Sequence, residues 1–344
     1  MYPLTFPYEI LSTANRNEWV LDPFCGRGTT LFAARIKSCN SVGIDSNQVA
    51  CAISKAKLVS TTANEVTRLC GHILGSKLSF DIPEGEFWEH CYSSSTLKQI
   101  CKIREYLLNS CETDAEIALR AIMLGILHGP RNVNTISYLS NQMPRTFSTK
   151  PKYSVNYWHK KGLEPPKIDV KEVVKRRAEF VFKTLPDRTN GFIIDQDSRK
   201  TFQVEAGVKF SWVITSPPYL GMVTYKQDQW LRNWFVGGPW KVDYTKPNQI
   251  SHISLNDFED DLKKVWKNVA DVCTKRAKLV IRLGVLPSFK GTAREILEST
   301  LEADWDIQAI ISAGMPGRGN RQAEHFGTSI GKANQELDCF AVLK

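Results

Sequence analysis

A short polar segment, Thr215-Ser216-Pro217-Pro218-Tyr219, directly follows the apolar run 210–214. Proline has no backbone N–H and cannot continue a sheet ladder, so a strand ends here and its last carbonyls stay free. The hydroxyl before the prolines and the aromatic ring after them suit a flat, hydrogen-bonding ring, with acceptors at its edge and the tyrosine on its face. The segment therefore predicts a slot for such a ring.

A second segment, Asp22-Pro23-Phe24-Cys25-Gly26-Arg27-Gly28-Thr29-Thr30, joins the apolar run 19–21 to a helical pattern that begins at Leu31. A strand, a glycine turn and a helix in this order let the backbone approach a ligand at the helix N-terminus. The next short strand ends in Asp45, where an acid binds ribose hydroxyls. The dinucleotide spacing is not met, because no third glycine follows Gly28, and Asp22 would repel a pyrophosphate. A ligand with a ribose and an amine but no phosphate fits, and S-adenosylmethionine is such a ligand.

These features, with Gly43-Ile44-Asp45 between them, resemble the motifs of the amino-group DNA methyltransferases, which modify an exocyclic nitrogen of cytosine or adenine. The resemblance covers roughly residues 1–60 and 191–344. It implies an α/β fold of the Rossmann-like class I methyltransferase type. Such a fold has a seven-stranded, mostly parallel sheet whose last strand is antiparallel, here with an inserted helical segment.

The resemblance also implies roles for individual residues. Ser216 and the Pro217 carbonyl would accept hydrogen bonds from the target amine, and Tyr219 would stack on the base, which makes Ser216, Pro217, Pro218 and Tyr219 the catalytic segment. Asp22 would accept from the α-amino group of the cofactor and Asp45 from its ribose. The full cofactor set comprises Phe6, Asp22, Phe24, Gly26, Gly28, Thr29, Asp45, Asp197 and Thr215. Asp195 competes with Asp197 for the adenine amine, and Phe6 is nearly as well explained as an ordinary core aromatic.

The positive charge of the chain is concentrated in one stretch. Net charge is +9, and residues 131–188 alone contain 13 Lys and Arg against 5 Asp and Glu. An excess of one sign favours contact with a polyanion. The predicted DNA contacts, in which aromatic residues alternate with the charges, are Lys152, Tyr157, Trp158, Lys160 and Lys161. The alternative is a basic surface over a small aromatic core. The glycine-rich loop with Arg318 and Arg321 either adds DNA contacts or is a plain hairpin loop.

The periodicity divides the chain into two parts. Residues 1–60 and 191–344 alternate strands and helices and form the predicted catalytic domain. Residues 61–190 form an inserted helical, basic region for target recognition or DNA binding. Within it, residues 61–130 show apolar residues at helical spacing. Residues 131–169 lose this spacing and contain four prolines, so they predict an irregular arm or long loop, before a helix that begins near Val170.

Several classes of protein are excluded or disfavoured. No stretch approaches 18 apolar residues and no signal peptide is apparent, so neither a membrane span nor membrane association is expected. The nine cysteines include no Cys-x-x-Cys pair, and Cys70, His72, His90 and Cys91 match no common zinc module, so no metal site is predicted. Free thiols predict a reducing, cytoplasmic location.

The sequence thus predicts a site-specific methyltransferase that moves a methyl group from S-adenosylmethionine to a base flipped out of double-stranded DNA. Cytosine N4 is favoured over adenine N6, because Ser216 stands where many adenine enzymes have Asp. One alternative is an RNA methyltransferase that acts on guanine N2 of tRNA, and another is a catalytically silent DNA-binding subunit. The sequence leaves open whether a restriction endonuclease or another defence-system subunit is a partner.

Overall fold

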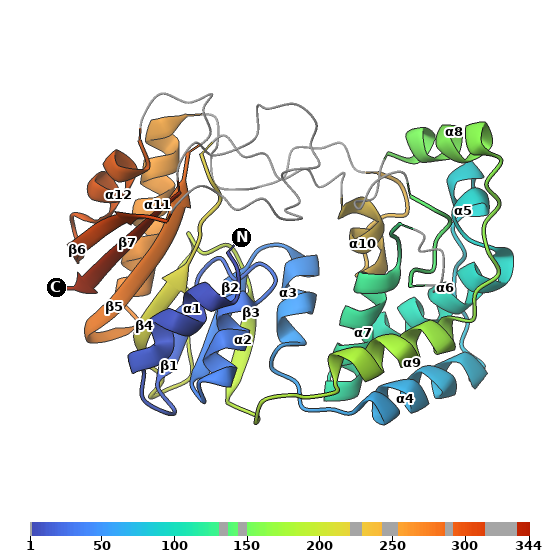
Figure 1. Cartoon of the computed structure of the whole chain (residues 1–344), viewed down its shortest axis with the longest axis horizontal. Helices are drawn as coiled ribbons and strands as arrows, with labels where there is room; N and C mark the ends of the chain where they lie inside the picture. The colour runs from blue at the N-terminus through green and yellow to red at the C-terminus, as the bar shows by residue number, and fades with distance from the viewer. Residues whose placement is uncertain are drawn as a thin grey trace. The chain divides into compact units, whose positions relative to one another are not determined.

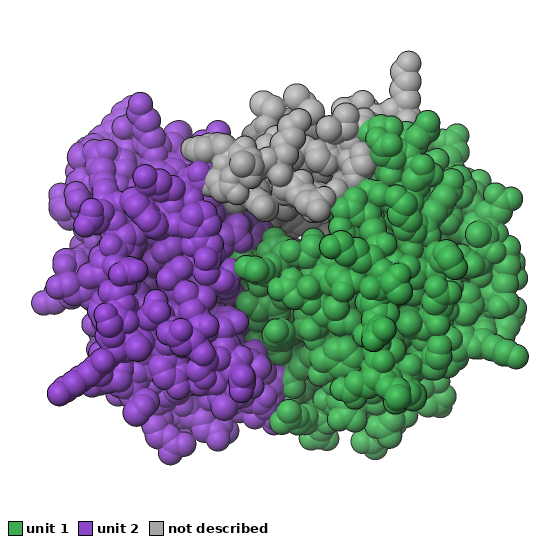
Figure 2. Space-filling model, turned by 180° about the vertical axis from the view of Figure 1, so that it is seen from behind, with its two compact units in different colours: residues 1–58, 186–224, 248–344 green, residues 59–185, 225–247 purple. Residues whose placement is uncertain are grey.

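The computed structural model of the chain describes residues 2–130, 137–143, 150–220, 229–242, 254–285, 292–313 and 336–344 (Figure 1). It contains two compact units (Figure 2). The sheet unit comprises residues 1–58, 186–224 and 248–344, and the helical unit comprises residues 59–185 and 225–247.

The sheet unit is built on one sheet of seven strands in the order β3-β2-β1-β4-β5-β7-β6. The strands are β1 (Trp19–Asp22), β2 (Asn40–Asp45), β3 (Gly191–Asp195), β4 (Phe210–Thr215), β5 (Cys273–Gly284), β6 (Trp305–Ser312) and β7 (Glu336–Leu343). β7 runs antiparallel to both β5 and β6, whereas the pairs from β3 to β5 are parallel. The predicted seven-stranded, mostly parallel sheet with an antiparallel last strand is confirmed.

Successive side chains of each strand point to opposite faces of the sheet. Val20 packs with Phe6 and Ala33 from α1 and α2, whereas the adjacent Leu21 packs in the cluster that contains residues of α11 and α12. This alternation follows from the twofold repeat of a strand. The helical elements of the unit are α1 (Thr5–Ile10), η1 (Leu11–Thr13), α2 (Thr29–Ile36), α3 (Gln48–Lys55), α11 (Leu255–Ala270) and α12 (Ala293–Leu301).

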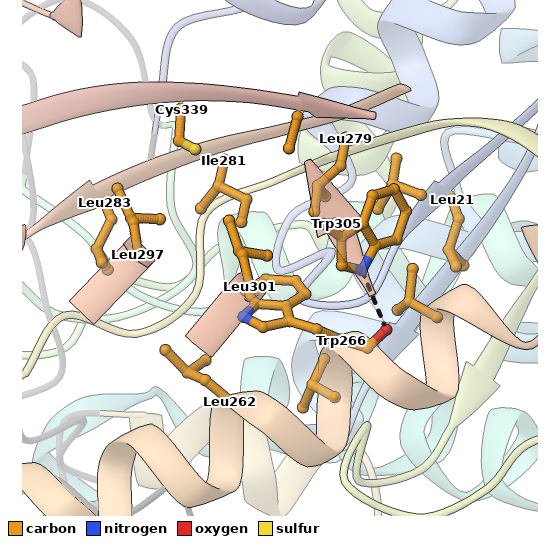
Figure 3. Close-up of a cluster of buried hydrophobic side chains, with 14 of the residues drawn as sticks. Leu21, Leu262, Trp266, Leu279, Ile281, Leu283, Leu297, Leu301, Trp305 and Cys339 are labelled. Atoms are coloured by element: carbon orange, nitrogen blue, oxygen red, sulfur yellow. Dashed lines mark hydrogen bonds between the residues drawn. The ribbon is translucent and has the colours of Figure 1, made fainter. Parts of the chain in front are cut away.

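A large apolar cluster of the sheet unit lies between the sheet and helices α11 and α12 (Figure 3). Its largest side chains are Trp266 on α11 and Trp305 at the start of β6, both almost fully buried. The Trp305 indole N–H donates to the Trp266 carbonyl at 3.4 Å, which gives one of the two buried indoles a partner. The cluster holds β1, β4 and β5 in one layer, and the carboxyl ends of these strands form the edge at which the candidate site lies.

A buried ion pair joins the two neighbouring strands β5 and β7. Arg282 and Asp338 are register partners, and both nitrogen–oxygen distances of the bidentate pair are 2.7 Å. Only 12% of the arginine side chain and 9% of the aspartate side chain are exposed. The guanidinium also stacks on the Phe6 ring, 3.8 Å from its centroid, and so connects α1 to this part of the sheet.

The helical unit contains α4 (Ala63–Gly75), α5 (Glu86–Cys91), α6 (Ser94–Asn109), α7 (Asp114–Ile126), α8 (Pro151–Lys161), α9 (Val170–Val181) and α10 (Trp230–Phe235). Thr62 and Thr113 form capping boxes with Glu65 and Glu116, which satisfy the first N–H groups of α4 and α7. The helical pattern predicted for residues 61–130 is therefore confirmed in its main elements.

The prediction of an irregular arm over residues 131–169 is wrong for residues 151–161, which form α8. Pro151 stands in the first turn, where a missing N–H costs no hydrogen bond, and Gly162 ends the helix at a φ of +58°. The prolines thus mark a boundary of the helix. Burial of Val155 and Trp158 supplies the apolar face.

Residues 225–247, which are predicted from the sequence to belong to the catalytic domain, cluster with the helical unit. The reason is aromatic packing: the rings of Trp230 and Trp234 on α10 lie 5.7 and 4.6 Å from that of Trp88 on α5. Arg104 and Arg232 add hydrogen bonds to the carbonyls of Trp234 and Leu124.

Across the part of the chain that the structure describes, every helix is too short or too polar to cross a membrane.

We expect Asp338→Ala to lower the free energy of unfolding by about 3 to 5 kcal/mol, because it leaves the Arg282 charge buried without its partner. The matched control is Glu298→Ala, which breaks an ion pair with Arg294 whose side chains are both 53% exposed, and which should cost less than about 1 kcal/mol. Denaturant unfolding followed by tryptophan fluorescence measures both. Equal losses in the two variants would contradict a special role for the buried pair.

Candidate functional site

Three adjacent strands of the sheet end in an aspartate. Asp22, Asp45 and Asp195 are the last residues of β1, β2 and β3, and Asp45 is the register partner of Asp195. Since the strands are parallel, these carboxylates share the carboxyl edge of the sheet. Burial raises the pKa of Asp45, backbone N–H groups of Asn47 and Gly26 oppose this, and the charge of Asp195 adds to the rise. This edge favours a ligand with cationic or hydrogen-bond-donating groups and disfavours phosphates.

The turn after β1 has the backbone conformation that its glycines predict. Gly26 has a φ of +51° and Gly28, the N-cap of α2, a φ of +72°, both in the left-handed region. The Gly26 N–H donates to Asp45 Oδ2 at 2.9 Å, and the Asn47 N–H donates to Asp45 Oδ1 at 2.9 Å. Each carboxylate oxygen of Asp45 can accept a second hydrogen bond, so the residue can order the turn and bind ribose hydroxyls together.

Asp22 has more partners than the sequence suggests. Its Oδ1 accepts from the Thr215 hydroxyl at 2.6 Å and from the Phe24 N–H at 3.1 Å, and its Oδ2 accepts from the Tyr2 hydroxyl at 3.2 Å. Only 2% of the residue is exposed. Burial raises its pKa to about 6, although hydrogen bonds from Thr215 and Thr30 oppose the rise. The α-amino group of a cofactor, the partner we expected, would meet a carboxylate that already joins β1, β4 and the N-terminal segment.

The slot segment begins where β4 ends. Thr215 is fully buried and its hydroxyl is directed to Asp22, so the first slot residue is attached to the start of the glycine turn. Ser216 and Pro218 are partly exposed and Pro217 is buried. Tyr219 is only 6% exposed, and its hydroxyl donates to Glu336 Oε1 at 2.8 Å. The ring is thus held at its hydroxyl end by the first residue of β7.

The aromatic residues assigned to the cofactor have other contacts in the described chain. Phe6 is 8% exposed and lies between Arg282 and Tyr2, whose ring centroid is 4.9 Å away. Phe24 is half-buried and packs edge-on against Trp266 at 6.3 Å. The position of Phe6 agrees with the alternative in which it is a core aromatic. Thr29, the first residue of α2, is partly exposed beside the turn.

The two candidates for the adenine contact differ in their surroundings. Arg199 binds both carboxylate oxygens of Asp197, at 3.0 Å from its Nε, and also binds Asp261 at 2.7 Å. Burial would raise the pKa of Asp197, but these hydrogen bonds lower it below its usual value. Asp195, in contrast, is exposed at the end of β3. The geometry therefore favours Asp195 over Asp197 as a ligand-binding group.

The predicted DNA contacts on α8 separate into exposed and buried residues. Lys152, Lys160 and Lys161 are exposed and Tyr157 is half-buried. Trp158 is fully buried, donates from Nε1 to the Gln142 carbonyl at 2.6 Å, and packs on Phe87. Its assignment as a DNA contact is corrected, because the indole belongs to the core of the helical unit.

Arg318 and Arg321 lie outside the described residues.

Sequence reasoning missed three residues that the structure connects to the site. The hydroxyls of Tyr2 and Thr30 are hydrogen-bonded to one another, and Thr30 also donates to the Ile214 carbonyl at 3.2 Å. Glu336 binds Tyr219 from the far end of the chain. The second threonine after the glycines was a visible signal for Thr30, whereas nothing in the sequence pointed to Tyr2 or Glu336.

The residues at this edge fit S-adenosylmethionine. The backbone at Gly26 lacks a side chain, and a Cβ there would meet nothing closer than the Phe24 carbonyl at 3.9 Å, so a ligand can approach the turn. The acids at the ends of β2 and β3 match ribose hydroxyls and an amine. A pyrophosphate would lie against three carboxylates and is disfavoured by charge.

The strand order and the glycine turn at the end of β1 define a Rossmann-like class I methyltransferase fold. The N6/N4 DNA methylase family model matches residues 3–56, the segment from α1 to α3. This match confirms the resemblance to the amino-group DNA methyltransferases over residues 3–56, and with it S-adenosylmethionine as the cofactor. Residues 191–344, including the segment 215–219, lie outside the match.

Solved structures resemble the chain at very low sequence identity. An rRNA methylase from Streptococcus thermophilus aligns with a TM-score of 0.36 and 8% identity, covering 100% of this chain and 98% of that one. A TehB-like SAM-dependent methyltransferase from Corynebacterium glutamicum gives 0.36 and 7%, covering 98% and 87%. The rRNA methyltransferase aviRa from Streptomyces viridochromogenes gives 0.35 and 10%, covering 99% and 85%. These scores are low, so the fold assignment rests on the strand order of this chain's own sheet.

No curated protein matches the sequence.

We expect the stability of the wild-type protein to decrease between about pH 4 and about pH 7 relative to Asp22→Asn. The folded pKa of Asp22 is about 6 against an ordinary value of 3.8, so ionisation disfavours the folded state. The protonated Asp22 carboxyl stabilises the folded state. This stabilisation is complete below the ordinary pKa of the group and is lost as the pH rises through its folded pKa. A shift of about two units corresponds to on the order of 3 kcal/mol. Unfolding free energies across this range measure the difference, and parallel pH profiles would contradict it.

We expect Gly28→Ala to weaken S-adenosylmethionine binding by roughly tenfold. A left-handed conformation costs a non-glycine residue about 1 to 2 kcal/mol, so the free turn relaxes to another conformation and the ligand must restore the original one on binding. The added Cβ would also lie 3.0 Å from Lys57 Cγ and 3.1 Å from Ser54 Cα, so the turn must shift. Gly125→Ala on α7, where a Cβ meets nothing within 4 Å, is the control and should leave the affinity unchanged. Calorimetric titration measures both, and wild-type affinity in Gly28→Ala would remove the turn from the cofactor site.

Proposed function

We propose that this protein is a site-specific DNA methyltransferase that transfers a methyl group from S-adenosylmethionine to an exocyclic amine of a flipped base. The observation that supports this most directly is the 2.6 Å hydrogen bond from Thr215 to Asp22. It joins the first residue of the slot to the first residue of the glycine turn. A cofactor at the turn and a base in the slot would then meet at neighbouring strand ends, as in-line methyl transfer requires.

The chemistry of the slot needs acceptors and no enzyme nucleophile. S-adenosylmethionine supplies an electrophilic methyl group on a sulfonium. The Ser216 hydroxyl and the Pro217 carbonyl accept hydrogen bonds from the two N–H groups of the target amine and hold its nitrogen toward that methyl group. The same acceptors stabilise the positive charge that develops on the nitrogen during transfer. Positioning supplies much of the remaining rate enhancement.

Tyr219 provides the flat surface for the base in this proposal. Its hydroxyl is occupied by Glu336, so the plane of the ring is set before a base arrives. The ring is only 6% exposed in the free protein, so a base would stack on it only after the residues that cover it move. The target leaves the duplex for this, at a cost of a few kcal/mol. Cytosine N4 is the favoured target over adenine N6, because Ser216 accepts with a neutral hydroxyl where many adenine enzymes have an acid.

The helical unit supplies the basic surface for the DNA backbone. Helix α8 contains Lys152, Lys160 and Lys161 and no acidic residue, and all three lysines are exposed. The exposed lysines of α11 in the sheet unit, in contrast, form ion pairs with acids three or four residues away in the chain. A face of one sign favours phosphate contacts, whereas a mixed face is typical of a solvated helix.

We expect tritium from labelled S-adenosylmethionine to enter duplex DNA and not bulk tRNA or rRNA. Ser216→Ala should reduce turnover by about 10²-fold or more while the Kd for DNA changes little, because the lost acceptor matters most as charge develops. Digestion of the labelled DNA to nucleosides then identifies the methylated base. Label in RNA alone would support the RNA methyltransferase alternative, and no label in either would support a silent DNA-binding subunit.

DNA affinity should decrease steeply with salt, and Lys152→Gln/Lys160→Gln/Lys161→Gln should reduce the slope of log K against log salt by about 0.9 for each lost phosphate contact. The matched control changes Lys263, Lys264 and Lys267 on α11 to glutamine and should keep the wild-type slope. Fluorescence anisotropy with a duplex oligonucleotide at several salt concentrations measures both. Equal slopes in the two triple variants would show that α8 does not contact the DNA backbone.

A further inference from the structure

Two helices of the helical unit bring three potential metal ligands together at their solvent-exposed edge. Glu86 and His90 lie one turn apart on α5, and His159 lies on α8. Their ligand atoms all lie within 4.8 Å of one another. Nothing in the proposed methyl transfer uses these residues, and none of them belongs to the sheet unit.

The backbone positions of the three residues are held by the buried side of the same interface. Phe87 follows Glu86 on α5 and Trp158 precedes His159 on α8, and their rings pack 5.6 Å apart. Trp158 is in addition fixed by its hydrogen bond to Gln142. The apolar contact therefore sets which polar side chains face one another on the outside, and the two helices cannot easily slide past each other.

The distances suit a divalent transition metal. His159 Nε2 and Glu86 Oε1 are 3.3 Å apart. Two ligands on a tetrahedral zinc with bonds of 2.0–2.1 Å are separated by about 3.3 Å. The His90 and His159 rings lie 4.5 Å apart at 61°, so their nitrogens can turn toward a common centre. The side chains of Glu86 and His159 are 66% and 54% exposed, so rotamer changes alone can close the remaining distance.

The donor set also selects the class of metal. Two imidazoles and one carboxylate suit Zn²⁺ and its neighbours, whereas Mg²⁺ and Ca²⁺ prefer oxygen ligands alone. The adjacent Cys91 is fully buried and does not join the cluster. Solvent can supply a fourth ligand at this exposed position.

We propose that Glu86, His90 and His159 bind one Zn²⁺-class ion that links α8, the lysine-bearing helix, to α5. The metal acts as a structural clip between two elements that are far apart in the sequence. Metal binding at this cluster does not depend on the proposed methyltransferase activity. Of the cysteines and histidines weighed in the sequence as zinc ligands, only His90 takes part.

The test uses the full-length protein, stripped of metal with EDTA and titrated with zinc chloride by calorimetry and by thermal unfolding. We expect one equivalent to bind and to raise the Tm, and EDTA to reverse the rise. His90→Gln and His159→Gln should each weaken binding by roughly tenfold or more. Glu86→Gln should also weaken it, although the amide retains the shape of the carboxylate.

His72→Gln is the matched control, because His72 is an exposed histidine on α4 of the same unit. It should keep the wild-type affinity and Tm shift. Each variant is first compared with the wild type in EDTA, and equal Tm values there show that a loss of binding is not a loss of folding. If one histidine variant does not fold, the other and Glu86→Gln decide.

Cobalt(II) provides a second readout, since the protein also contains free thiols. Ligation by nitrogen and oxygen gives only weak visible bands, whereas thiolate ligation gives intense charge-transfer absorption. Weak bands that disappear in His90→Gln and His159→Gln support the clip. Unchanged zinc affinity in both variants, an equal loss in His72→Gln, intense thiolate absorption, or no zinc binding by the wild type would each overturn it and leave Glu86 and His159 as an ion pair only.

Discussion

The hydrogen bond from Thr215 to Asp22 is the contact on which the candidate site depends. β1 and β4 are neighbours in the sheet, and their pairing ends at Leu21 and Val213, one residue before Asp22 and two residues before Thr215. The bond continues the connection between the two strands beyond the ladder, just where the glycine turn and the proline segment diverge. Tyr2 binds the same carboxylate from the N-terminal segment. One buried acid thus determines the relative position of the turn, the slot and the start of the chain.

Such an arrangement has an electrostatic cost. Asp22 is almost completely buried, so its charged form is disfavoured and its pKa rises, and only its hydrogen bonds oppose the rise. The two other strand-end acids add negative charge along the same edge, and Asp195 raises the pKa of Asp45. A cationic ligand would relieve this repulsion, whereas an anionic one would increase it. The repulsion among these carboxylates therefore destabilises the free site and favours a cofactor with a sulfonium and an amine.

The helical unit follows a different principle. Its centre is aromatic: Phe87, Trp88, Trp158, Trp230 and Trp234 pack on one another from α5, α8 and α10. Large rings bury much area per residue and so stabilise short helices that could not persist alone. With the apolar residues inside, the lysines of α8 remain outside. Composition thus sets the number of positive charges on α8, and packing places them on its exposed side.

The sequence by itself determined the sheet, the glycine turn, the end of β2 at Asp45 and the end of β4 before the prolines, because strand periodicity, left-handed glycines and missing N–H groups are local properties of the chain. It also indicated the class of enzyme. It misjudged α8, because the prolines of residues 131–169 were read as breakers and the buried Trp158 was taken for a DNA contact. Only the tertiary structure decided the partners of buried polar groups: Tyr2 and Thr215 on Asp22, Arg199 on Asp197, and Glu336 on Tyr219. Apart from Arg199 and Asp197, which are two residues apart, these pairings join residues that are distant in the chain. Their geometry depends on which strands and helices pack together, which no local pattern encodes.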